Sequence, residues 1–134
     1  IDTSGRRKNL AKYILARLEC DISERACDPD TDPGSVEHIL PENPRSEWEA
    51  MFPQEQWDRV IYRLGNLTLL EPNLNRQVGN APYLEKVAAY GKSVYAITSR
   101  IPNDAPDEWT LARMEARQDR MAQRASHLWR VDFA

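Results

Sequence analysis

The chain has 134 residues, a length typical of one folded domain with its own core. Its apolar content of 41% and charged content of 29% are those of an ordinary globular protein, and no apolar run reaches the roughly 18 residues that a membrane helix needs. The first residues also lack the order of a secretion signal. We therefore expect residues 1–134 to form a single domain in the cytoplasm, without a membrane partner. Because the chain begins with Ile1 rather than Met, we expect it to be part of a longer protein.

Charge is distributed unevenly along the chain, although the net charge is only −3. Residues 1–18 carry five basic groups and one acid, residues 19–58 carry twelve acids and two bases, and residues 109–130 carry five arginines and two acids. This division suits a site in which carboxylates hold a cation while basic groups hold phosphate. Solvated helix faces and an acidic loop would give the same pattern, so charge alone leaves both interpretations open.

Cysteine and histidine are scarce, with Cys20, Cys27, His38 and His127 as the full set. Two cysteines are too few for a disulfide framework, and four such residues hardly make a four-ligand zinc site. We therefore predict no structural zinc and two free, mostly buried thiols.

The first predicted element is an amphipathic helix from Arg6 to Leu18, because apolar residues recur there every three or four positions. Residues 28–34 contain two prolines, a glycine and three aspartates, a composition that favours a loop. A short strand from Val36 to Leu40 follows, and Pro41 ends it because proline has no N–H for a strand ladder. His38 is thus expected near the end of a strand.

The middle of the chain is predicted to contain a helix and a second strand. Residues 48–61 have helical periodicity, interrupted by Pro53, and the apolar stripe stops at Gly65, a typical residue after a helix. The strand is expected from Asn66 to Leu70. The tryptophans at positions 48, 57, 109 and 129 are expected to anchor the core.

The last third is predicted to be helical, with two or three short helices in residues 72–100 and a long helix from Leu111 to about Trp129. The long helix begins either with Pro106 in its first turn or with Thr110 as its N-cap. On one of its faces four arginines are spaced 4, 3 and 4 apart, which makes a basic stripe or simply a solvated face: Arg113, Arg117, Arg120 and Arg124. The predicted fold class is α+β and mainly helical, with two short strands that could form a hairpin.

Two segments carry a recognisable combination of polar residues: Val36-Glu37-His38-Ile39-Leu40-Pro41, and Arg63-Leu64-Gly65-Asn66-Leu67-Thr68-Leu69-Leu70 followed by Asn73-Leu74-Asn75-Arg76. They resemble the signature of the HNH (His-Me finger) nucleases, in which a strand carries His-Ile-x-Pro, a second strand begins with Asn-Leu, and a helix supplies the last ligand. The chain departs from that signature at Asn75, which stands in place of the third-motif histidine, and at Gly79, where a further histidine would stand. The resemblance implies a ββα-metal core wrapped by additional helices.

The same segments, together with Tyr83, Lys86 and the stretch from Trp109 through Arg117 to Trp129, resemble the C-terminal domain of GmrSD-type and SspE-type restriction enzymes. The resemblance spans most of the chain. It implies an anti-phage enzyme that cuts DNA, with a separate N-terminal domain of the same chain that uses nucleotide and senses DNA modification.

The resemblance and the chemistry of phosphodiester hydrolysis together suggest roles for three residues. An imidazole with a pKa near 6.5 can take a proton from water at neutral pH, so His38 is the predicted general base. Asn66 is expected to orient the loop after His38 through amide hydrogen bonds, although it could simply cap a turn. Asn75 is expected to hold Mg²⁺ or Mn²⁺, which prefer oxygen ligands, although it could instead be a helix N-cap.

The remaining assignments concern a further metal ligand, the nucleic-acid contacts and the second histidine. Glu37 is a candidate metal ligand, but adjacent residues on a strand point to opposite faces, and it could be a solvated carboxylate. Four residues are candidate nucleic-acid contacts that could equally be solvated surface groups: Arg76, Asn80, Lys86 and Arg117. His127 is expected to pack near a helix end or to carry a favourable charge there.

The sequence thus predicts a metal-dependent DNA endonuclease that nicks or cleaves DNA in a bacterial restriction system. Two other classes of protein stay open. One is a catalytically silent DNA-binding module that uses the arginine stripe, and the other is an interaction domain that docks on the neighbouring part of the protein. These motifs do not recognise the sugar, so the preference for DNA over RNA comes from the family context alone.

Overall fold

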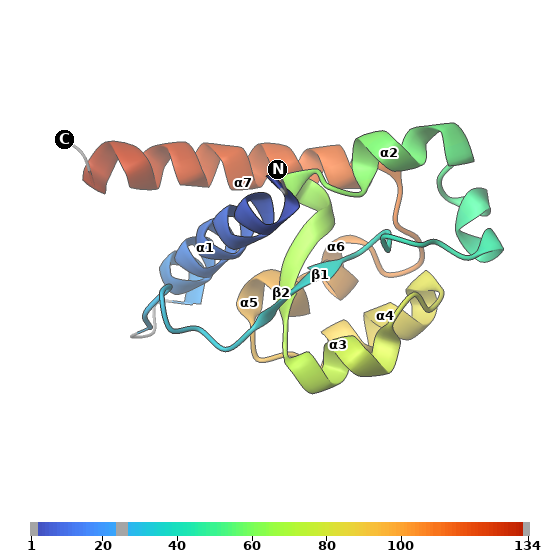
Figure 1. Ribbon diagram of the computed structural model, residues 1–134, viewed down its shortest axis with the longest axis horizontal. Coiled ribbons are helices and arrows are strands. Elements are labelled where there is room, and N and C mark those ends of the chain that lie inside the picture. Colours follow the sequence, from blue (N-terminus) through green and yellow to red (C-terminus); the bar gives the residue numbers. More distant parts are fainter. Residues whose placement is uncertain (1–2, 24–26, 133–134) are drawn as a thin grey trace.

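The computed structural model describes residues 3–23 and 27–132, and its architecture is α+β and mainly helical, as predicted. Within the described residues, strands β1 (Ser35–His38) and β2 (Leu67–Leu70) form one antiparallel sheet. Its register places His38 opposite Leu67 and Ser35 opposite Leu70. Figure 1 shows this small sheet at the centre of the molecule, with α1 and α7 on one side and α3 and α4 on the other.

The two long helices are α1 (Thr3–Ser23) and α7 (Leu111–Asp132), and they pack against each other. Thr110 lies immediately before α7, and its hydroxyl accepts a hydrogen bond of 3.3 Å from the backbone N–H of Arg113. Thr110 is therefore the N-cap, and Pro106 lies outside the helix. None of the described helices is long and apolar enough to cross a lipid bilayer.

The connection between the strands is a series of short turns instead of the predicted helix over residues 48–61. It contains the 3₁₀ helices η1 (Ser46–Ala50) and η2 (Gln54–Gln56), the single turn α2 (Trp57–Val60), and η3 (Leu64–Asn66). Pro53 separates η1 from η2, because a proline inside a helix removes a donor and clashes with the preceding turn. The apolar periodicity in this segment reflects burial of successive short turns.

After β2 the chain forms α3 (Pro72–Val78), α4 (Tyr83–Tyr90), α5 (Ala96–Ser99) and α6 (Ile101–Asp104). The prediction of two or three short helices in residues 72–100 is confirmed. Gly79 ends α3 with a φ of 47°, a backbone conformation that glycine adopts without steric penalty. This turn lets the chain reverse direction beside the end of β1.

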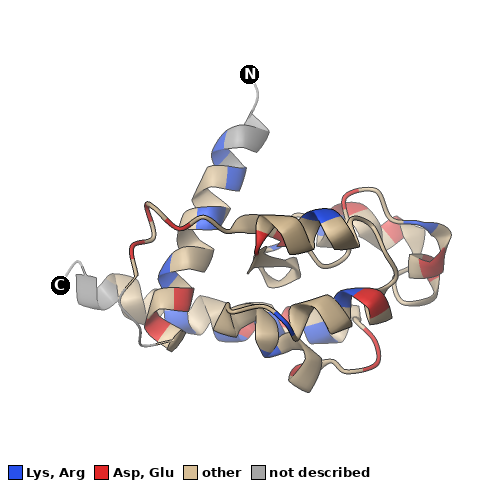
Figure 2. Cartoon of the chain, turned by 90° about the horizontal axis from the view of Figure 1, so that it is seen from below, with Lys and Arg blue, Asp and Glu red and all other residues tan. Residues whose placement is uncertain are grey.

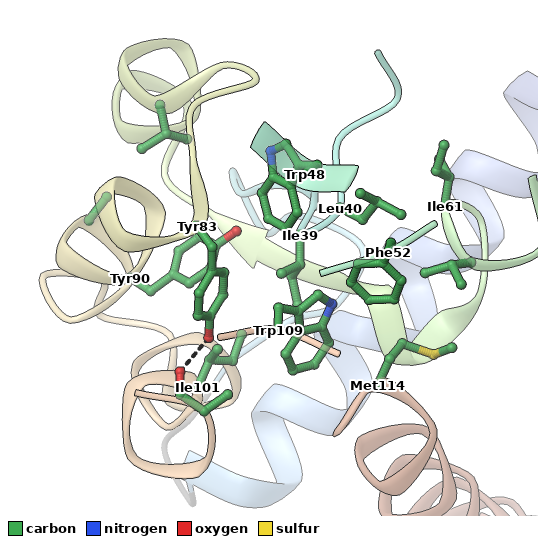
Figure 3. Close-up of a cluster of buried hydrophobic side chains, with 14 of the residues drawn as sticks. Ile39, Leu40, Trp48, Phe52, Ile61, Tyr83, Tyr90, Ile101, Trp109 and Met114 are labelled. Carbon is green, nitrogen blue, oxygen red and sulfur yellow. Dashed lines mark hydrogen bonds between the residues drawn. The ribbon is translucent and has the colours of Figure 1, made fainter. Parts of the chain in front are cut away.

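Two apolar clusters cover the two faces of the sheet, because alternate residues of a strand point to opposite sides. Val36 and Leu69 belong to the cluster that includes Leu15 of α1, whereas Leu70 belongs to the cluster that includes Tyr90 of α4. Figure 3 shows the second cluster, in which the Tyr83 ring stacks on Trp109 with 6.3 Å between ring centroids.

The four tryptophans do not share one environment. Trp48 and Trp109 are 1% and 2% exposed, as predicted for core anchors, whereas Trp57 and Trp129 are only partly buried.

The prediction of free, buried thiols is wrong, because Cys20 and Cys27 form a disulfide. Cys20 lies in the last turn of α1 and is half-buried, and Cys27 is exposed. Their Cα atoms are 5.8 Å apart, a distance that a disulfide spans readily. The disulfide therefore joins Cys27 to the last turn of α1, and nothing in the sequence near the two cysteines predicts it.

Candidate functional site

The candidate site is a cleft of about 520 Å³ beside the end of β1. The last residues of β1 and the segment after it form one wall, and α3 with its terminal turn forms another. Lys8 of α1 lies on a third side. The polar residues that line the cleft are Lys8, Glu37, His38, Glu42, Asn43, Asn75 and Asn80.

His38 lies at the end of β1, with a side chain that is 13% exposed. Its ring meets the ring of Tyr62 edge-on, with 5.7 Å between centroids. The imidazole Nδ1 is 3.8 Å from the Glu42 carboxylate, which in turn accepts a hydrogen bond of 3.0 Å from the Tyr62 hydroxyl. The imidazole is thus held between an aromatic ring and a carboxylate at the edge of the cleft.

Burial lowers the pKa of His38 below its ordinary value of 6.5, since partial removal from water disfavours the imidazolium. The nearby Glu42 carboxylate opposes this shift, and the positive charges of Lys8 and Lys86 add to it. The neutral imidazole, which is the form that can accept a proton, therefore predominates at neutral pH.

The direction of this shift predicts the pH dependence of any reaction that uses His38 as a base. The rate should rise with pH as the imidazolium loses its proton, and should level off with a midpoint below 6.5. A profile of kcat/KM between about pH 5 and pH 8 at saturating metal would measure it. Glu42→Gln should move the midpoint lower, because the carboxylate stabilises the imidazolium. A wild-type midpoint above 6.5 would contradict the assignment.

Asn66 fixes the backbone immediately after His38. The Asn66 side chain is fully buried, and its amide exchanges two hydrogen bonds with Leu40, from Leu40 N–H to Oδ1 at 2.9 Å and from Nδ2 to the Leu40 carbonyl at 3.0 Å. Nδ2 also donates to the Ile61 carbonyl, and Oδ1 also accepts from Trp109 Nε1. Four hydrogen bonds therefore use the full capacity of the amide and bind the segment after β1 to the start of β2.

Asn75 lies within α3, three residues after its first residue, so it is not the helix N-cap. Its Nδ2 donates to Ser35 Oγ at 2.8 Å and to the Val36 carbonyl at 3.2 Å. Both amide hydrogens are thereby used, and within the described part of the chain no hydrogen bond to Oδ1 is found. The amide is thus oriented by β1, and Asn75 lines the same cleft as His38.

Glu37 and Lys86 form a buried ion pair, with Lys86 Nζ 2.9 Å from Glu37 Oε2. The Tyr90 hydroxyl donates to the same carboxylate oxygen at 2.6 Å, and Lys86 Nζ also donates to the His38 carbonyl at 2.7 Å. Burial has the largest effect on both groups, and it raises the pKa of Glu37 and lowers the pKa of Lys86. The charge of each group opposes this effect, because it favours the charged form of its partner.

The position of this pair changes two interpretations from the sequence. Glu37 is 3% exposed and is not a solvated carboxylate, and its engagement with Lys86 and Tyr90 makes it a poor metal ligand. Lys86 is fully buried and does not offer its ammonium to phosphate. Strand alternation explains the arrangement, because Glu37 points toward α4 while its neighbour His38 points to the opposite face.

The oxygen donors of the cleft fit a hard divalent cation that keeps most of its water. Mg²⁺ is typically bound by one or two protein oxygens together with substrate phosphate. Here Asn75, with its amide oxygen, and Glu42, with a half-exposed carboxylate, line the same cleft as His38. The described residues contain no group of three or more His, Cys, Asp or Glu side chains placed to hold a metal. A cation at this site would take further ligands from water and from the substrate phosphate.

The four arginines of the possible basic stripe on α7 all have partners within the protein, and the first of them, Arg113, donates to the Glu108 carbonyl at 2.8 Å. Arg117 is 7% exposed and donates to the carbonyls of Gly65 and Leu67 at 2.9 and 2.7 Å, and burial lowers its pKa to about 10. Arg120 is paired with Asp104, and Arg124 is paired with Asp21. Arg117 therefore supports the turn before β2 and is not placed to contact phosphate.

The other two proposed nucleic-acid contacts lie on or just after α3. Asn80 lines the cleft, and its Nδ2 donates to the Asn43 carbonyl at 3.2 Å. Arg76 is exposed and lies outside the residues that line the cleft. His127 is exposed near the end of α7, so it does not pack in the core.

Sequence reasoning missed three residues around His38, namely Lys8, Glu42 and Tyr62. Glu42 follows His38 by four residues, but the sequence around Pro41 does not indicate whether the chain turns so that Glu42 approaches the imidazole. Tyr62 follows a predicted helix and resembles a surface residue. Lys8 lies thirty residues before His38 in the sequence, and only the packing of α1 on the sheet brings it to the cleft.

One of the comparisons with known proteins gives a match. Residues 1–124 match the family described as GmrSD restriction endonucleases, C-terminal domain. The searches of curated proteins and of solved structures give no match. Because the family match covers nearly the whole chain, including both strands, the Asn66 turn and most of α7, this chain belongs to the C-terminal domain family of the GmrSD restriction endonucleases.

Proposed function

We propose that this chain is a divalent-metal-dependent DNA endonuclease of the HNH type, with His38 as its general base. The observation that carries the proposal is the setting of His38. Its imidazole lines a polar cleft, its carbonyl is held by Lys86, and the following residues are fixed by Asn66. A restriction endonuclease family supplies the substrate class, which is DNA.

In the proposed reaction, neutral His38 accepts a proton from a water molecule as the water oxygen attacks phosphorus. The bond between phosphorus and the 3′ oxygen breaks, and the departing oxygen takes up a proton from solvent. Asn66 and Lys86 keep the base in place, since a small displacement of a catalytic group can lower a rate about a hundredfold. Glu42 and Tyr62 set the orientation of the ring.

A Mg²⁺ or Mn²⁺ ion bound here would neutralise charge on the phosphate and on the departing oxygen. Asn75 is the residue that we assign to hold it, through Oδ1, because Asn75 lines the cleft and its Nδ2 already donates to Ser35 and Val36. Asn80 is the residue on the same wall that we assign to contact the substrate backbone, and the exposed Arg76 on α3 is a further candidate.

The family also suggests where the reaction takes place and which other domain takes part in it. We propose that the domain acts in the cytoplasm against phage or modified DNA, and that an N-terminal domain of the same protein uses nucleotide and senses the modification. Such a division would place the choice of target outside this chain and the chemistry within it.

Metal removal is the direct test of the proposed activity. The purified protein should convert supercoiled plasmid to nicked or linear DNA with Mg²⁺ or Mn²⁺, and EDTA should abolish the conversion. Asn75→Ala should raise the Mn²⁺ concentration needed for half-maximal cleavage, whereas Asn73→Ala, an exposed neighbour on the same helix, should not. Gel quantification over a metal titration gives both numbers.

Two results would overturn the proposal. Cleavage that persists in EDTA would exclude a metal-dependent reaction. Metal-independent and salt-sensitive DNA binding without any cleavage, in the presence of the N-terminal domain and nucleotide, would instead favour a silent DNA-binding module.

A further inference from the structure

We propose that Lys8 of α1 forms a phosphate-binding subsite of the His38 cleft, and that it holds the phosphodiester backbone of the substrate beside the base. The inference rests on the proposed function and extends it, because it names the side chain that receives the negative charge of the substrate.

The geometry of the sheet explains why α1 reaches the site. His38 and Val36 lie on the same face of β1, because they are two residues apart on one strand. Val36 packs in the apolar cluster that contains Leu15 of α1. That face of the sheet is therefore covered by α1, and His38 points toward the same helix.

The periodicity of α1 then places Lys8. It precedes Leu15 by seven residues, which is close to two full turns, so both side chains lie on one face of the helix. Leu15 is fully buried against the sheet, whereas Lys8 is exposed and lines the cleft. In Figure 2 the helix extends past the body of the molecule at this end, with blue basic residues along it.

The distribution of charge in the cleft suggests that Lys8 binds phosphate. Among the described residues that line it, Lys8 is the one Lys or Arg, while Glu42 adds an exposed carboxylate. A phosphodiester that enters would meet amides and negative charge on the other walls, and a cation opposite them would offset the repulsion. Lysine suits this task, as a mobile point charge that binds phosphate without fixed geometry.

An electrostatic effect supports the same placement. Lys8 and His38 line the same cleft, and the positive charge of Lys8 adds to the lowering of the His38 pKa. The imidazole also faces Glu42 and Tyr62, and Lys86 lies near it at the His38 backbone carbonyl. Lys12, one turn further along the same face of α1, does not line the cleft and has no such effect.

Lys8→Ala and Lys12→Ala are the matched pair for the test, because each removes one positive charge from the same helix. In plasmid cleavage, Lys8→Ala should raise KM about threefold to tenfold with little change in kcat, while Lys12→Ala should match wild type. Binding of a short DNA duplex can be followed by fluorescence anisotropy over a series of salt concentrations. The slope of log binding constant against log salt concentration should become shallower by about 0.9 in Lys8→Ala and stay unchanged in Lys12→Ala.

A third readout needs no DNA. The His38 pKa, followed by NMR with His127 as internal reference, should rise in Lys8→Ala and stay unchanged in Lys12→Ala. Equal KM, salt slope and His38 pKa in the two variants would overturn the Lys8 subsite even if wild type cleaves DNA. Conversely, the subsite would stand and the nuclease would be refuted if no cleavage occurs even with the N-terminal domain and nucleotide present, while Lys8→Ala alone lowers the salt slope.

Discussion

His38→Ala is expected to lower the rate of DNA cleavage by about 10²- to 10⁴-fold, the contribution typical of a general base. The effect should fall on kcat, because the imidazole acts on water and the substrate phosphate is held elsewhere. The fold should survive, since the ring is held by edge contact with Tyr62 and a 3.8 Å approach to Glu42. The backbone carbonyl that Lys86 binds is retained in the variant.

Single-turnover cleavage with excess protein would measure this loss without interference from product release. His127→Ala is the matched control, because the second histidine is exposed near the end of α7 and lies outside the cleft. Thermal unfolding should give similar midpoints for both variants and wild type. Full activity in a folded His38→Ala protein would remove His38 from the mechanism.

Lys86→Met is expected to destabilise the fold by about 3 to 5 kcal/mol, the usual effect of removing one partner from a buried ion pair. The lysine is fully buried, so its loss leaves the Glu37 carboxylate without its cation. It also leaves the His38 carbonyl without its donor. Chemical denaturation followed by tryptophan fluorescence would give the change in the free energy of unfolding.

A double variant separates charge burial from positioning. Glu37→Leu combined with Lys86→Met removes both charges and should recover more than half of the lost stability, because an apolar pair can replace a buried ion pair. Cleavage should still be slower than in wild type, since nothing then holds the carbonyl of His38. Lys92→Met, at an exposed position after α4, should change neither quantity. No loss of stability in Lys86→Met would mean that the pair is dispensable to the fold.

The elements that depend on local pattern could be predicted from the sequence. The apolar repeat of α7, the strand that ends before Pro41, and the loop at residues 28–34 all follow from residue type and spacing. The segment that contains η1 and α2 could not, because apolar spacing of 3 to 4 residues is shared by a helix and by successive buried turns.

Charged residues were harder to place, because burial of a charge depends on a partner that is distant in the sequence. Lys86 pairs with Glu37, which is 49 positions away in the sequence. Arg117 donates to the carbonyls of Gly65 and Leu67, which are about 50 positions away. Single residues of this kind resemble surface groups in a sequence. The motif residues His38, Asn66 and Asn75 were identifiable since family resemblance carries long-range information that local periodicity lacks.

The hydrogen bonds of Asn66 also have a consequence for the order in which the protein is made. Its amide joins segments near residues 40, 61 and 109. Arg117 donates to the carbonyls of the residues immediately before and after Asn66. During synthesis the strand that carries His38 emerges long before Trp109 and α7. We expect the site to stay unassembled until those last elements leave the ribosome, so that an unfinished chain would carry the histidine of a nuclease without its activity.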